Sequence, residues 1–201
     1  MSVGSYGKIL AYQAAARGQD PAFEFGDETI NLFRLDRRAN RAARGLMRLG
    51  VTPGSRVALM LPDSPEFVYA LFGALRIGAA VVPIPAAARG EVLAELLARA
   101  QAPALVTHND LYKNYRRVAK QAPVIKRVAV SLRDASPVLK IFPGVDIMQD
   151  WFEMLSPDPL ESGGKKLSPS LVFLAEESGT EIVSGTVGLK KLETAVRAVL
   201  S

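Results

Sequence analysis

Cysteine is absent from the 201 residues of this chain, and histidine occurs once. The first absence excludes a disulfide framework, a thiolate metal site and a cysteine nucleophile. The single histidine, His108, ends an apolar run that predicts a strand, and a lone histidine in such a place is usually structural. Because no cysteine or second histidine accompanies it, we assign no catalytic residue and no metal site.

Long apolar runs are also missing. The two longest, 67–75 and 77–85, are interrupted by Arg76, Gly78 and prolines, and neither reaches the roughly eighteen residues of a membrane span. The N-terminal residues contain no basic segment followed by an apolar core, so no signal peptide is expected. Together with the lack of cysteine, these absences predict a cytoplasmic protein without a membrane span.

Positive charge is concentrated in one segment. The chain has a net charge of +5 and a pI near 9.6, and the segment 34–48 alone holds six arginines and one aspartate. At about 100° per residue the arginines fall on one side of a helix, opposite leucines and alanines. No aromatic residue interleaves them, so we expect a solvated helix face and no nucleic-acid binding. The arginines are Arg34, Arg37, Arg38, Arg41, Arg44 and Arg48.

Apolar runs and turn residues alternate along the first two thirds of the chain. A helix is expected at 5–17, a hairpin at 22–30, and the arginine helix between an N-cap at Asn31 and Gly50. Further strands are expected at 56–61, 79–84, 104–108 and 126–132, with helices at 65–78 (capped by Ser64), 90–101 and 111–121. This alternation predicts an α/β fold, a parallel sheet with helices on both faces.

Composition divides the chain into three parts. Residues 1–132 form the predicted α/β scaffold subdomain. Residues 133–168 are rich in proline, glycine and serine and read as a connecting region. Residues 169–201 then hold a buried strand at 171–175, a glycine-rich loop and a terminal helix at 190–200, which would begin a next subdomain.

Three stretches resemble the N-terminal subdomain of the acyl-adenylate-forming (AMP-binding) family, which includes acyl-CoA synthetases, aryl-CoA ligases, nonribosomal adenylation domains and luciferases. They are LDRRANRAARGL at 35–46, LGVTPGSRVALMLPDSPEFVYALFGALRIGAAVVPI at 49–84, and APALVTHNDLY at 102–112. The resemblance covers about half the chain, in the family's order. It implies that this half is scaffold and subunit contact.

The resemblance also implies a reaction. In the family, a carboxylic acid attacks the α-phosphate of ATP, with Mg²⁺, and CoA then attacks the acyl-adenylate. The 201 residues show no segment resembling the family's ribose-binding aspartate, hinge or C-terminal lysine domain. We therefore expect an N-terminal fragment of an acyl- or aryl-CoA ligase that is inactive alone. The alternative is a non-catalytic nucleotide-binding or interaction module that pairs with a full-length synthetase.

A chain of this length would leave part of the predicted sheet uncovered. Sheets of this class are normally covered on both faces, so an exposed apolar edge or face is expected. Self-association through that surface follows.

Chemistry is implied near the glycine-rich stretch, where the family has a phosphate loop of the form S/T-S-G-T-T-G-x-P-K-G. Glycines in such a loop let backbone N–H groups approach the ATP phosphates, and its lysine offsets their charge. In one register the matching residues are Ser184, Gly185, Thr186, Gly188 and Lys191.

Two other registers remain open. In one, Ser178, Gly179 and Thr180 match the phosphate loop directly after the last strand, but the lysine is lost and two glutamates precede the loop. In the other, Thr180 and Glu181 match a later glycine-threonine-glutamate turn that helps to bind adenine and metal in the family. A plain glycine-serine turn is the remaining interpretation.

Overall fold

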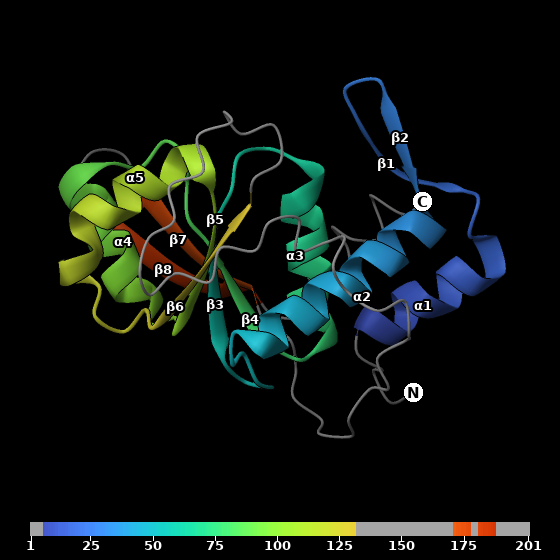
Figure 1. Cartoon of the computed structure of the whole chain (residues 1–201), viewed down its shortest axis with the longest axis horizontal. Coiled ribbons are helices and arrows are strands. Elements are labelled where there is room, and N and C mark those ends of the chain that lie inside the picture. The colour runs from blue at the N-terminus through green and yellow to red at the C-terminus, as the bar shows by residue number, and fades with distance from the viewer. Residues whose placement is uncertain (1–5, 132–170, 178–180, 188–201) are drawn as a thin grey trace.

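The computed structural model describes residues 6–131, 171–177 and 181–187 (Figure 1). In chain order the elements are α1 (Tyr6–Arg17), β1 (Pro21–Phe25), β2 (Glu28–Asn31), α2 (Leu32–Arg48), β3 (Arg56–Met60), α3 (Pro65–Arg76), β4 (Ala80–Pro83), α4 (Gly90–Ala100), β5 (Ala104–His108), α5 (Asn109–Val118), the 3₁₀ helix η1 (Ala119–Gln121), β6 (Arg127–Ser131), β7 (Leu171–Glu177) and β8 (Glu181–Val187). No helix within these ranges is both long and apolar enough to cross a membrane.

The main sheet has the described strand order β6-β5-β3-β4-β7-β8. The first five of these strands are parallel, and β8 returns antiparallel to β7. The predicted parallel α/β sheet is therefore confirmed. The strands β1 and β2 form a separate antiparallel hairpin, as the sequence also predicts.

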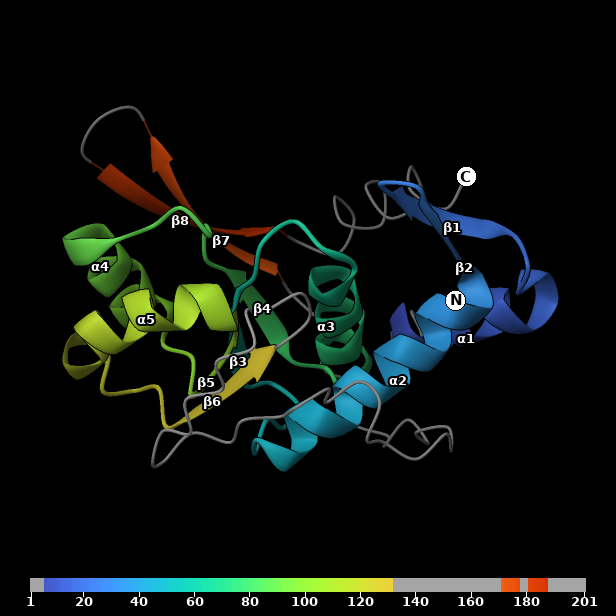
Figure 2. The same ribbon diagram turned by 45° about the horizontal axis from the view of Figure 1, so that its top comes forward.

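Helices cover both faces of the main sheet (Figures 1 and 2). Alternate residues of β3 explain this arrangement, because successive side chains of a strand point to opposite faces. Val57 and Leu59 belong to the core formed with α1, α2 and α3. Ala58 and Met60 belong to the core formed with α4 and α5. All four side chains are fully buried, which is why the strand reads as a continuous apolar run.

The helix α2 packs against α3 at a very close approach. A Cβ atom at Gly73 of α3 would lie 2.7 Å from the Cβ of Ala42 and 2.7 Å from the backbone nitrogen of Ala43. Beside this contact, the guanidinium of Arg76 binds the carboxylate of Asp36 and donates to Asn40 Oδ1 at 2.8 Å. Small residues thus set the distance between the helices, and the polar cluster fixes their register.

The predicted ends of α2 are confirmed, whereas the predicted cap of α3 differs in detail. Asn31 caps α2 by accepting from the N–H of Arg34 at 2.8 Å, and Gly50 has a positive φ of 74° beyond the helix end. Ser64 precedes α3 as predicted, but its side chain makes no capping hydrogen bond. The predicted connecting region and terminal helix lie outside the described residues.

The largest difference concerns the glycine-rich stretch. Where the sequence analysis expects a loop, residues 181–187 form the strand β8. Four of these seven residues, Ile182, Val183, Thr186 and Val187, are β-branched, which favours a strand. Pairing with β7 supplies the remaining stabilisation and extends that strand to Glu177, two residues beyond the predicted end.

Candidate functional site

The carboxyl edge of the parallel sheet contains a topological switch point. The chain passes from β3 through α3 to β4 on one side of β3, and then through α4 to β5 on the other side. The segments that follow the neighbouring strands β3 and β5 therefore lead to helices on opposite faces. In open α/β sheets, ligands bind in the crevice outside the carboxyl ends of such strands.

His108 lies at this point, at the last position of β5, and its role is structural. Its Nδ1 accepts a hydrogen bond from the backbone N–H of Asp110 at 3.3 Å and so caps α5. Because Nδ1 accepts here, the neutral imidazole carries its proton on Nε2. The carboxylate Oδ2 of Asp110 lies 3.5 Å from the same nitrogen.

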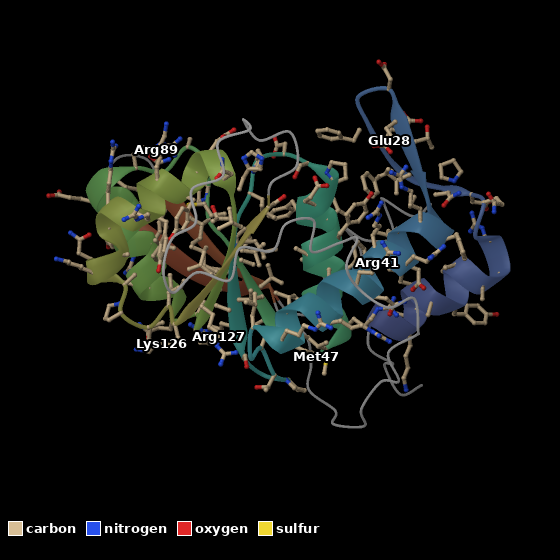
Figure 3. All side chains as sticks on the ribbon, viewed as in Figure 1. Glu28, Arg41, Met47, Arg89, Lys126 and Arg127 are labelled. Atoms are coloured by element: carbon tan, nitrogen blue, oxygen red, sulfur yellow. The ribbon has the colours of Figure 1, made fainter. Side chains whose placement is uncertain are left out.

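The segment between β4 and α4 is held by an arginine that the sequence analysis did not single out. Arg89 donates from Nη1 to the backbone oxygens of Ala86 and Ala88, the latter at 2.7 Å. Figure 3 labels Arg89 beside α4 at this end of the molecule. Arg89 belongs to no motif in the sequence, so nothing in the sequence pointed to these bonds. Its two hydrogen bonds tie the end of the segment to its own backbone.

The hairpin of β7 and β8 extends beyond this edge. Leu171 pairs with Val81, so β7 continues four residues beyond the level of Pro83 at the end of β4. At 3.3 Å per residue this is about 13 Å. Glu177 pairs with Glu181 at the far end of the hairpin, with three residues between them. The chain thus reverses on the carboxyl side of the sheet.

The predicted phosphate-contact residues fall in different parts of this hairpin. In the first register, Ser184, Gly185 and Thr186 lie inside β8, paired with residues of β7. Gly188 and Lys191 of that register lie outside the described residues.

Of the residues in the two alternative registers, Glu181 falls within the described part of the chain. Glu181 is the first residue of β8. Ser178, Gly179 and Thr180 lie between the paired strands and outside the described residues. Within the described ranges, no group of three histidine or acidic side chains could hold a metal ion.

Comparisons with known proteins agree with this architecture. A family model described as "AMP-binding enzyme" matches residues 10–184. Crotonobetaine/carnitine–CoA ligases of Salmonella typhimurium and Salmonella paratyphi B are 37% identical over 112 residues, which is 49% of this chain and 22% of theirs. The chain therefore spans about a fifth of the length of these curated relatives.

Solved structures share the fold at low sequence identity. An anthranilate CoA ligase, AuaEII, in complex with anthranoyl-AMP gives a TM-score of 0.76 at 20% identity, covering 92% of this chain and 35% of that chain. The N-terminal domain of FACL13 from Mycobacterium tuberculosis gives 0.74 at 18% identity, covering 94% and 45%. A long-chain-fatty-acid–CoA ligase from Archaeoglobus fulgidus gives 0.70 at 22% identity, covering 98% and 40%.

The family match includes α2, the whole parallel sheet and the hairpin as far as Ser184 of β8. The order of strands, the covered faces and the curated relatives all lead to the same assignment. The chain belongs to the AMP-binding enzyme family.

Proposed function

We propose that this chain is the N-terminal part of an AMP-forming acyl- or aryl-CoA ligase. Such an enzyme joins a carboxylic acid to the α-phosphate of ATP, releases pyrophosphate, and transfers the acyl group from AMP to the sulfur of CoA. Support comes from the family match over residues 10–184 and from curated relatives that are CoA ligases. ATP, Mg²⁺, CoA and a carboxylic acid are the proposed ligands.

The observation that carries the proposal is the β7–β8 hairpin beyond the carboxyl edge of the sheet. We place the phosphate contacts at its chain reversal, residues 178–180. A reversal after a strand can present free backbone N–H groups to an anion, whereas the backbone of Ser184–Thr186 is paired with β7. Ser178 and Thr180 would each donate a hydroxyl hydrogen bond, and Gly179 would allow a close backbone approach.

This register assigns no lysine to the phosphates. Bound Mg²⁺ would neutralise part of the phosphate charge, as it does in phosphate-transfer sites generally. The residues of this chain would then orient the phosphates and exclude alternative positions. Positioning of this kind is a large part of catalysis in reactions at phosphorus.

We also propose that the 201 residues alone do not form a CoA thioester, because they span only 22% of the curated relatives' length. The experiment incubates the chain with ATP, Mg²⁺, CoA and a panel of aliphatic and aryl carboxylic acids, and measures AMP. No AMP above a protein-free control is expected. AMP production that depends on both acid and CoA would overturn the proposed inactivity while supporting the proposed chemistry.

A further inference from the structure

A groove lies along the arginine face of α2. Its volume is about 350 Å³, and six described residues line it: Asn31, Phe33, Arg34, Arg37, Arg38 and Arg41. This volume falls within the roughly 300–1,000 Å³ of sites that bind small molecules. Figure 3 labels Arg41 on α2 and Glu28 on the neighbouring hairpin at the same end of the molecule, away from α4 and α5.

Helix geometry brings the four arginines together. Residues three and four positions apart lie on one face of a helix, and Arg34, Arg37, Arg38 and Arg41 follow this spacing. Arg34, Arg38 and Arg41 are half-buried, and Arg37 is exposed. A solvated face was expected, so the intermediate burial of these three residues is a difference.

Among the described residues that line the groove, positive side chains outnumber negative ones. Arg34 forms an ion pair with Glu28 of β2, while Arg37 lies over the ring of Phe33 with its guanidinium carbon 5.6 Å from the ring centroid. Asp36, the acidic residue of α2, binds Arg76 of α3 instead of an arginine of the groove. Of the six described lining residues, four are cationic and none is acidic.

Placing four arginines on one helix face creates electrostatic repulsion that a bound anion would reduce. Arg34 and Arg38 are four residues apart, as are Arg37 and Arg41, and like charges at this spacing destabilise a helix. The positive end of the helix dipole adds to the repulsion at the first turn. The arrangement therefore favours occupation by negative charge.

The hydrogen bonds to a bound anion would come from the guanidinium groups and not from the backbone N–H groups at the start of α2. The first N–H groups of α2 are already bonded within the protein: Leu32 to the oxygen of Asp20 at 3.0 Å, and Phe33 to the oxygen of Gly18 at 2.9 Å. The N–H of Arg34 is bonded to Asn31. Arginine binds phosphate through two parallel N–H···O bonds, a geometry that lysine cannot supply.

We infer that this groove binds a small ligand that carries two or more linked phosphate groups. Arg34 and Arg41 are seven residues apart, so the cationic row spans about 10 Å along the helix axis. One phosphate would engage only part of this row, whereas a linked series would engage several guanidiniums together. The six described residues of the groove belong to α2 and the end of β2, so the inference does not depend on the proposed function.

The test titrates inorganic tripolyphosphate into the full chain by calorimetry at moderate salt. Arg37→Ala/Arg38→Ala removes two guanidiniums of the groove, and Lys113→Ala/Arg117→Ala removes two exposed charges from α5 on the other face of the sheet. The groove variant should weaken binding about tenfold or more, since each lost bond is to a charged group. The α5 variant should change binding by less than about twofold because of salt screening.

Several results would overturn the inference: no saturable heat with tripolyphosphate, equal weakening in both variants, or equally tight binding of monophosphate. A short DNA duplex that binds more tightly through the same arginines would assign the face to nucleic acid instead. ATP tests whether a nucleotide or only inorganic phosphate chains enter the groove, and either binding supports the site.

A second measurement covers the case in which the groove variant fails to fold. In ¹⁵N spectra of the unaltered chain, tripolyphosphate should shift the amides of α2 and of the β1–β2 hairpin. Shifts confined to residues near 178–180 would overturn the inference, and they would support the proposed phosphate site at the same time.

Discussion

Replacing Gly73 with alanine tests the close packing of α2 on α3. The added Cβ would lie 2.7 Å from the Cβ of Ala42 and 2.7 Å from the backbone nitrogen of Ala43. Carbon atoms pack best at about 3.5–4.0 Å. One neighbour is backbone and cannot rotate away, so α3 must move outward by about 1 Å, the difference between that optimum and the clash.

Two effects oppose each other in this variant. Overpacking a core costs about 1–3 kcal/mol, while alanine in place of glycine in a helix gains about 1 kcal/mol. Gly73 is buried where α3 faces α2, and both contacts are shorter than 3.0 Å. We therefore expect a cost near the upper end of that range and a net loss of about 1–2 kcal/mol. For a chain of this size that corresponds to a melting temperature lower by about 2–8 °C.

Thermal unfolding followed by circular dichroism measures this effect on the full chain. The double variant Gly73→Ala/Ala42→Gly removes one of the two clashes. Its loss of stability should therefore be smaller than the sum of the losses in the two single variants. An unchanged or higher melting temperature for Gly73→Ala would refute the close approach. Additive effects in the double variant would show that the two residues do not touch.

Three further outcomes are expected. Asp36→Asn leaves the buried guanidinium of Arg76 without its opposite charge and should cost about 2–4 kcal/mol in chemical denaturation. Asp20→Asn breaks an exposed ion pair with Arg17 and should cost less than about 1 kcal/mol. Equal losses in the two variants would contradict the buried cluster. Burial raises the pKa of Tyr69 and Tyr115, so the free energy of unfolding should fall as pH rises above about 10. The fall should be smaller in Tyr69→Phe. A free energy of unfolding that does not change above about pH 10 would contradict this. Sedimentation should show concentration-dependent self-association, and a monomer at every concentration would exclude it.

The sign of the tyrosine effect follows from proton linkage. A phenol with a raised pKa in the folded state keeps its proton where the unfolded chain has already lost it. Stability from this source is fully present below the unfolded pKa of about 10 and is lost as pH passes through the raised value. The cause at Tyr69 is burial, opposed by the nearby charges of Arg34 and Arg38.

Local chemistry explains why much of the fold could be predicted. The cap at Asn31, the apolar face of α2 and the buried run of β3 are encoded in neighbouring residues. The parallel sheet followed from the alternation of strands and helices, whereas the order of its strands was not predicted. The close contact at Gly73 could not be predicted, because it depends on which helix packs against α3.

Non-local pairing explains what the sequence did not reveal. The stretch 181–187 contains serine and glycine and was expected to be a loop, but pairing with β7 makes it a strand. The groove on α2 depends likewise on where the β1–β2 hairpin sits against the arginine face. The aromatic ring of the groove comes from Phe33, which directly precedes the arginine segment 34–48 in the sequence.

Calorimetric titration of Mg²⁺-ATP tests the proposed phosphate site most directly. It is best done in the Arg37→Ala/Arg38→Ala background, so that binding in the groove does not contribute. We expect a saturable isotherm that Thr180→Ala weakens by about tenfold or more, the loss of one hydrogen bond to a charged group. Thr186→Ala and Lys191→Ala should leave it nearly unchanged. No saturable heat, or weakening by either of the last two changes with Thr180→Ala unaffected, would contradict the account.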